Sequence, residues 1–204
     1  MTPETDSLFA FVNRLYRETP ELIQLATAKT DEEFEAAFDL VLDKTVRGLE
    51  ANKVNFETLG EEGLSADLAH SLSMPGIAVM PEMNSNGHVD VVIYVYLCNP
   101  RRTKLCEAKI YDGPAYHIKG MRQLLNRYST GRESRLLLIS YVRKRNIKGL
   151  IDGLRKRLDR DRPLSQKGPT RDHTMKWSFL SSHVHSSGEI LHVGHVGCNL
   201  HIDA

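Results

Sequence analysis

The 204-residue sequence has few cysteines, one tryptophan and no long apolar run. Its three cysteines, Cys98, Cys106 and Cys198, are an odd number without paired spacing, which argues against a disulfide framework and favours reduced thiols. No stretch approaches the roughly 20 apolar residues that span a bilayer, and the N-terminus lacks the basic-then-apolar pattern of a secretion signal. We therefore expect a cytoplasmic protein without a membrane partner.

Net charge is also nearly absent, since 27 basic residues balance 26 acidic ones to give +1, but this balance hides an asymmetry. Up to Asp67 there are 15 acidic against 6 basic residues, whereas 11 basic residues meet 3 aspartates between Arg143 and Arg171. Such a basic stretch is often a solvated helix face, but it is also the footprint expected of a protein that binds nucleic acid. Length and composition predict a single globular domain with a sizeable core.

Charged residues stand inside two segments that otherwise read as β-strands. Residues 87–93 and 104–110 are apolar and β-branched, and the turn cluster Asn99-Pro100-Arg101-Arg102 between them predicts a β-hairpin. Asp90 lies in the first segment, and Glu107 and Lys109 share one face of the second because side chains alternate along a strand. Charges on a central strand lose solvation unless they are paired or bind a metal. The hairpin is therefore the candidate site.

The register of this hairpin decides whether its charges meet. A turn centred between Pro100 and Arg101 sets Asp90 opposite Tyr111 and leaves Glu107 too distant to share an ion, at about 3.4 Å per residue. A turn centred between Asn99 and Pro100 sets Asp90 opposite Lys109, with Glu107 one diagonal step away. We predict the second register, or a bulge with the same result.

The chemistry of these residue types points to phosphoryl transfer. Two carboxylates supply the hard oxygen ligands of Mg²⁺ or Mn²⁺, ions that take further ligands from water and substrate phosphate. A neighbouring lysine can orient the attacking water and neutralise charge on a pentavalent phosphorus. A purely structural reading, in which Asp90, Glu107 and Lys109 form a buried ion network, stays open.

Asp90, the triplet Glu107-Ala108-Lys109, Gly113-Pro114 and a helix with Gln123 together resemble the PD-(D/E)XK superfamily of restriction-endonuclease-like nucleases. The resemblance covers roughly residues 57–150. It implies that Asp90 and Glu107 are metal ligands, that Lys109 is the catalytic lysine, and that Gln123 supports the site or contacts the phosphate backbone. The proline that gives the motif its name is missing, since Val89 precedes Asp90.

Glu61 has two interpretations. The run Thr58-Leu59-Gly60-Glu61 has the pattern of a capping box, in which Glu61 would close the start of a helix that continues through Leu64 and Leu68. Related nucleases place a glutamate on the helix before the first strand, and the resemblance gives Glu61 that role, with Glu62 as the substitute. Both interpretations stay open.

The expected fold class is α/β, with a restriction-endonuclease-like mixed sheet of four to five strands flanked by helices. Residues 1–52 form an N-terminal helical region, 53–160 the nuclease core, and 161–204 a basic loop and a β-hairpin that extends the core. The spacing of apolar residues, together with residues that begin or end helices, predicts helices from Thr2-Pro3-Glu4 to Pro20, from Thr30 to Leu49, and over 58–72, 115–129 and 146–158. The same signals predict strands over 77–81 and 136–142. The C-terminal hairpin turns at Ser187-Gly188.

The function expected from the resemblance is a Mg²⁺-dependent endonuclease acting on DNA rather than RNA, in a bacterial restriction or anti-phage defence system. It implies a partner protein of that system or self-association. Basic residues placed to meet the nucleic acid are Lys119, Arg122, Arg127, Arg143, Lys144 and Arg145. The alternative is a nuclease-like subunit that binds nucleic acid or protein without cleaving.

A histidine cluster in the C-terminal segment offers a second metal hypothesis. Imidazole and thiolate are zinc ligands, and the segment contains His183, His185, His192, His195 and Cys198. Their spacing fits no zinc finger, and His192 and His195 have opposite parity on a regular strand. Histidines that pair across strands or line the surface are the competing interpretation.

Overall fold

The computed structural model describes residues 8–84 and 88–203, and the side chains of Leu8 and of residues 82–89 are not described. The predicted helix start at Thr2-Pro3-Glu4 lies outside the described residues, and so does Gly87, the first residue of the predicted hairpin. Five helical segments precede the sheet: α1 Leu8–Glu18, α2 Pro20–Thr27, α3 Asp31–Ala51, the short η1 Lys53–Phe56 and α4 Glu61–Leu72. No helix within the described ranges is both long and apolar enough to cross a membrane.

The long helix α3 begins where its sequence predicts. Thr30 accepts a hydrogen bond from the backbone of Glu33, and the Glu33 carboxylate accepts one from Thr30, so both halves of the capping box are present. Phe34, Phe38 and Leu42 follow at helical spacing and are fully buried. Pro20 was expected to end the first helix, but it also begins α2, because proline suits the first turn of a helix.

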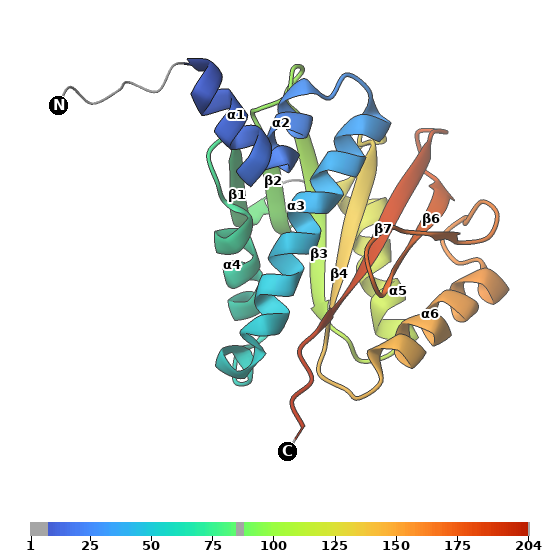
Figure 1. Cartoon of the computed structure of the whole chain (residues 1–204). Helices are drawn as coiled ribbons and strands as arrows, with labels where there is room; N and C mark the ends of the chain where they lie inside the picture. Colours follow the sequence, from blue (N-terminus) through green and yellow to red (C-terminus); the bar gives the residue numbers. More distant parts are fainter. Residues whose placement is uncertain (1–7, 85–87, 204) are drawn as a thin grey trace.

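Seven strands form one mixed sheet in the order β1-β2-β3-β4-β7-β6-β5 (Figure 1). The α/β class is therefore confirmed, but the predicted count of four to five strands is wrong. Strand β7 pairs in parallel with β4 and carries the C-terminal hairpin into the sheet. The strand bounds are β1 Ile77–Asn84, β2 His88–Val95, β3 Arg102–Ile110, β4 Arg135–Val142, β5 Arg171–Asp172, β6 Ser178–Val184 and β7 Ile190–Asn199.

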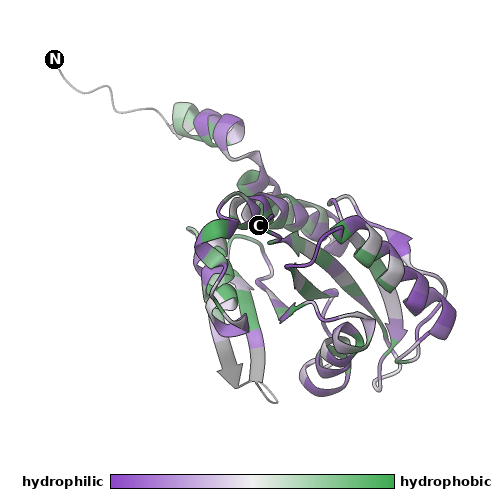
Figure 2. Cartoon of the chain, turned by 90° about the horizontal axis from the view of Figure 1, so that it is seen from below, coloured by the Kyte–Doolittle hydropathy of each residue, from purple (hydrophilic) through white to green (hydrophobic). Residues whose placement is uncertain are grey.

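Helices cover both faces of this sheet. Helices α3 and α4 lie on one face, while α5 Pro114–Gln123, its π-helical continuation η2 Leu124–Tyr128 and α6 Ile147–Asp161 lie on the other. The crossover β3-α5-β4 joins parallel strands, as expected for a strand-helix-strand unit. Figure 2 shows apolar strands between helices whose outer surfaces are hydrophilic. Two hydrophobic cores result, one on each face.

The register of β2 against β3 differs from the prediction by two residues. Val91 pairs with Cys106 and Val95 with Arg102, so the same register extended by one step sets Asp90 opposite Glu107 and not Lys109. A shift of two residues leaves each side chain on its predicted face, and the apolar alternation therefore cannot distinguish these registers. The observed pairing centres the turn between Cys98 and Asn99, one residue before the predicted centre.

A chain of buried polar side chains crosses the core beneath α5. Hydrogen bonds of 2.7–2.9 Å link Ser140 to His117, His117 to His195, His195 to Ser181 and Ser181 to His183. The chain ends where His183 Nδ1 meets the Leu164 carbonyl at 3.0 Å. Burial lowers the pKa of His117 to about 3 and also lowers the pKa of His183 and His195, so the imidazoles are neutral. Because a carbonyl only accepts, the donor direction of every bond in the chain is fixed.

We predict that Ser181→Ala destabilises the fold by about 1–3 kcal/mol, because it leaves buried imidazole nitrogens of His183 and His195 without partners. Ser182→Ala is the matched control, since its half-buried hydroxyl contacts only His192 and should cost less than about 1 kcal/mol. Urea denaturation of both variants provides the measurement. Equal losses of stability would contradict a continuous buried chain.

Candidate active site

The three predicted side chains of the hairpin converge at the carboxyl end of β3, where β2 leaves its partner strand. The ladder between the strands ends at Val91 and Cys106, and the Asp90 carboxylate then accepts the Ala108 N–H at 3.0 Å. Lys109 Nζ lies 3.3 Å from Asp90 Oδ2 and 2.9 Å from Glu107 Oε1. The side chains therefore share one pocket, although the predicted register was wrong.

Glu61 joins this cluster from α4. The N-cap of α4 is Gly60 and makes no side-chain capping bond, so the predicted capping box is absent. Instead Glu61 Oε1 accepts hydrogen bonds from the Ile110 N–H at 3.0 Å and from the Tyr116 hydroxyl at 3.1 Å. Glu61 Oε2 lies 3.6 Å from Lys109 Nζ. The substitute candidate Glu62 is exposed and lines a groove beside the cluster, but it is not part of the cluster.

Glu107 is the most unusual member of the cluster. Its side chain is 0 % exposed, and neither carboxylate oxygen has an aligned hydrogen-bond partner among the described residues. The contact with Lys109 is thus an ion pair whose geometry falls short of a hydrogen bond. Burial and then the Asp90 charge raise the pKa of Glu107 to about 7. Ionisation of this carboxyl in the folded protein therefore costs stability.

Lys109 stays protonated despite its own burial. Withdrawal from solvent favours the neutral amine, but the charges of Glu107, Asp90 and Glu61 outweigh this effect and raise the pKa of Lys109 above its usual value. Its side chain is only 15 % exposed. The lysine is consequently a fixed cation among three carboxylates.

Helix α5 closes the wall of the site on the other side. A Cβ atom at Gly120 would lie 3.4 Å from Glu107 Cγ and 3.5 Å from Lys109 Cγ, which are ordinary contact distances, so α5 packs directly against the stems of both side chains. Gln123 donates its amide to the Tyr128 hydroxyl at 3.2 Å. Burial and then the Glu107 charge raise the pKa of Tyr128. Within the described residues, no hydrogen bond or ion pair joins Gln123 to the cluster, so its predicted supporting role stays a prediction.

Sequence reasoning missed Tyr116, which helps to hold Glu61. The residue stands near the start of α5, three positions after Gly113, and no pattern marks it as different from an ordinary helix tyrosine. Its hydroxyl shares Glu61 Oε1 with a backbone N–H, which leaves Oε2 directed at the cluster. Only the tertiary structure, which brings the starts of α4 and α5 together at the end of β3, reveals this role.

A groove of about 870 Å³ opens the cluster to solvent. Asp90 and Glu61 side chains are 25 % and 30 % exposed, so a ligand in the groove can reach both. The lining comes from the start of α4, from β1 and from the cluster itself: Thr58, Leu59, Gly60, Glu61, Glu62, Gly63, Ser65, Ala66, Pro81, Asp90 and Lys109.

The donor set fits a hard cation that keeps most of its water. Residues 8–84 and 88–203 contain no group of three His, Cys, Asp or Glu side chains that would hold an ion by themselves. Mg²⁺ needs only one or two carboxylates when water and substrate phosphate supply its other ligands. The buried Glu107 oxygens without hydrogen bonds, next to Asp90, meet that requirement.

The predicted nucleic-acid contacts fall into two groups. Lys119, Arg122 and Arg127 are exposed on α5 and η2, the segment that walls the site. Arg143 instead donates to the backbone carbonyls of Phe56 and Leu59, a structural contact. The exposed Lys144 and Arg145 pair with Asp112 and Asp203 respectively.

The five residues of the zinc hypothesis do not assemble. His183 and His195 belong to the buried chain through Ser181, whereas His192 contacts Ser182 and His185 contacts Ser187. Cys198 is buried in the core under α3 and α4, on the face of β7 opposite His195. The arrangement matches the competing interpretation, in which the histidines pair with strand neighbours.

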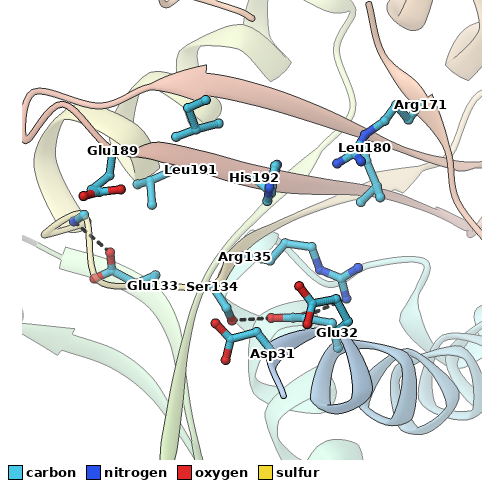
Figure 3. Close-up of a pocket in the computed structure, with 13 residues that line it drawn as sticks. Asp31, Glu32, Glu133, Ser134, Arg135, Arg171, Leu180, Glu189, Leu191 and His192 are labelled. Atoms are coloured by element: carbon cyan, nitrogen blue, oxygen red, sulfur yellow. Dashed lines mark hydrogen bonds and ion pairs between the residues drawn. The ribbon is translucent and has the colours of Figure 1, made fainter.

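A second pocket, of about 440 Å³, lies at the other end of β4 between α3 and the C-terminal hairpin (Figure 3). Arg135 reaches into it, but its guanidinium is already paired with Glu35 and Asp39. Ser134 donates to Glu35 as well. These side chains therefore bond to one another, whereas the Glu107 oxygens have no hydrogen bond among the described residues. This difference distinguishes the pocket from the cluster around Glu107.

Comparison with models of known protein families, with curated proteins and with solved structures finds no match for the chain.

Glu107→Gln should remove a pH-dependent loss of stability. With a pKa of about 7 in the fold against 4.5 in the unfolded chain, folded Glu107 retains a proton through this window, so its contribution to stability falls as the pH rises from 4.5 to 7. At pH about 8 without divalent metal, the variant should therefore gain on the order of 2–3 kcal/mol over the wild type. Urea denaturation across this pH range measures the difference.

The exposed neighbour provides the control for this measurement. Glu62→Gln removes a carboxylate from the same groove without removing a buried charge, and its stability profile should follow that of the wild type. Parallel profiles for Glu107→Gln and wild type would show that Glu107 carries no buried charge.

Proposed function

We propose that the protein is a metal-dependent nuclease that hydrolyses phosphodiester bonds of nucleic acid. The observation that carries this proposal is Glu107, a fully buried carboxylate without a hydrogen bond, which lies behind Asp90 and Lys109, two residues that line an open groove. Such a group costs stability unless a cation completes its environment. The cost makes sense at a site that must bind a divalent ion together with substrate phosphate.

The same molecule shows what a purely structural charge network looks like. On the opposite face, Lys104 donates to both oxygens of Glu35, and Arg135 pairs with Glu35 and Asp39. His173 completes the surroundings of Asp39. Every carboxylate there has hydrogen-bond partners, whereas Glu107 has none among the described residues. This contrast favours a functional over a structural reading of the Glu107 cluster.

Asp90 and Glu107 are the residues that would hold the ion, with Glu61 Oε2 directed at the same place. When bound, Mg²⁺ or Mn²⁺ would supply a Lewis acid that lowers the pKa of a water ligand and neutralises phosphate charge. Lys109 holds a positive charge where it can orient a water and stabilise charge that develops on phosphate. The backbone N–H groups of Ala108 and Ile110 fix Asp90 and Glu61, so the carboxylates are oriented before substrate arrives.

Lys109→Ala and Asp90→Asn should each lower Mg²⁺-dependent cleavage by at least about 100-fold, because each removes a charge that acts on the reacting phosphate. The assay incubates purified protein with plasmid, linear DNA and RNA, with and without Mg²⁺. DNA is the expected substrate under the proposed resemblance, and the RNA arm tests that choice.

Circular dichroism and the matched control Lys148→Ala separate chemistry from folding. Lys148 is an exposed lysine on α6 that pairs only with Asp152, so its removal should leave cleavage unchanged. Asp90→Asn keeps an acceptor for the Ala108 N–H and reduces the negative charge around Lys109, so its fold should survive even if that of Lys109→Ala does not. Wild-type cleavage by a folded Asp90→Asn variant would refute the assignment. Binding without cleavage by the wild type would favour a non-cleaving subunit.

A further inference from the structure

The side of β2 that carries Asp90 continues into an aromatic surface. Side chains alternate along a strand, so Asp90, Val92 and Tyr94 share one face of the sheet, and Tyr96 follows where the strand ends. At about 3.3 Å per residue, Tyr94 lies roughly 13 Å and Tyr96 roughly 20 Å from Asp90. The path therefore leads from the candidate active site to the opposite end of the strand.

Tyr94, Tyr96 and Arg101 form a stack at that end. The two tyrosine rings are 6.2 Å apart between centroids and inclined by 19°, and the Arg101 guanidinium lies 5.3 Å from the centroid of Tyr96. The backbone N–H of Tyr96 donates to Gly76 at 2.8 Å, so the platform is anchored to the strand pair β1-β2. Flat aromatic rings under a guanidinium are the geometry in which a nucleobase can replace the arginine.

This face of the sheet is open along β1 and at the end of β2, whereas Val92 and Leu105 in its middle are buried in the core that α5 and η2 cover. Helix α5 and η2 pack over β3 and β4, whereas Tyr96 and Met80 on the strand pair β1-β2 remain 46 % and 44 % exposed. Between Asp90 and Tyr96 the residues on this face of β1, β2 and β3 are apolar, aromatic, threonine or arginine. No carboxylate of these strands stands between the candidate active site and the platform to repel a phosphate backbone.

Basic residues surround the platform. A pocket of about 330 Å³ beside it is lined by Arg101, Arg132 and Thr103, and Thr103 pairs with Tyr94 across the strands. Its two acids are Asp31, which pairs with Arg102, and Glu133. Because Arg101, Arg102 and Arg132 outnumber these acids, the lining carries a net positive formal charge, which suits phosphate.

We propose that the Tyr94-Tyr96-Arg101 stack binds an unpaired strand of nucleic acid and guides it along the exposed β1 side of this face, past Met80, to Asp90, which makes single-stranded nucleic acid the substrate class. The inference rests on the proposed function for the chemistry at Asp90. Bases stack on the tyrosines, and Arg101 moves from the Tyr96 ring to a phosphate. A duplex keeps its bases stacked on one another and offers none to the tyrosines.

Fluorescence anisotropy of the full chain without divalent metal tests binding separately from cleavage. Labelled single-stranded DNA and RNA should bind at least about tenfold more tightly than a duplex of equal length. Tyr96→Ala should weaken single-strand binding by about tenfold, the effect expected when one base loses its aromatic partner, and should leave duplex binding unchanged. Tyr96→Phe keeps the ring and should bind like the wild type.

The matched control is Tyr16→Ala, which removes a tyrosine on α1 that is 64 % exposed and lies far from the platform along the chain. It should change neither affinity. Equal affinity for duplex and single strand, or no effect of Tyr96→Ala, would overturn the platform even if Lys109-dependent cleavage is found. Tyr96-dependent binding without any cleavage would instead retain the platform and refute the nuclease.

Discussion

The Glu107 carboxylate, withdrawn from solvent near the centre of a seven-stranded sheet, is the constraint on which the candidate site depends. Lys109 supplies the nearest positive charge, and it is shared with Asp90 and Glu61. One cation thus balances three acids in a place where unpaired charge is costly. Each surrounding element, β2, β3, α4 and α5, contributes either one of these groups or the packing that holds it.

Two buried clusters of charged side chains lie on opposite faces of the sheet, and they differ in how their charged groups are hydrogen-bonded. The cluster of Lys104, Glu35, Arg135 and Asp39 joins α3 to β3 and β4, and its groups are mutually hydrogen-bonded. Burial lowers the pKa of Lys104, and the Glu35 charge opposes this shift. That cluster fixes the position of a helix. The Glu107 cluster faces a groove, and both Glu107 oxygens lack a hydrogen bond among the described residues. Burial of this carboxylate therefore lowers the stability of the fold, and a bound cation would offset that loss.

The end of the β2-β3 ladder creates the site. If β2 continued to pair beyond Val91, backbone hydrogen bonds would occupy the Ala108 N–H that now holds Asp90. Because the strands separate, the Ala108 N–H donates to the Asp90 carboxylate and not to the backbone of β2. The Ile110 N–H likewise donates to the Glu61 carboxylate. Helix α5 packs at Gly120 against the apolar stems of Glu107 and Lys109. The geometry of the cluster and the separation of the strands therefore have a common physical origin.

The sequence by itself determined the α/β class, the capping box of α3, the central hairpin and the common face of Glu107 and Lys109, because these follow from local periodicity and alternation. It could not decide the hairpin register, since a shift of two residues leaves each side chain on the same face. It left two interpretations of Glu61 open, a helix cap and a ligand in the site, and it gave no signal for Tyr116. It also predicted a sheet of only four to five strands. Those features depend on contacts between residues far apart in the chain: α4 with β3, α5 with α4, and β4 with β7. Only tertiary packing brings such groups together, because no local pattern specifies which distant backbone N–H a carboxylate will meet.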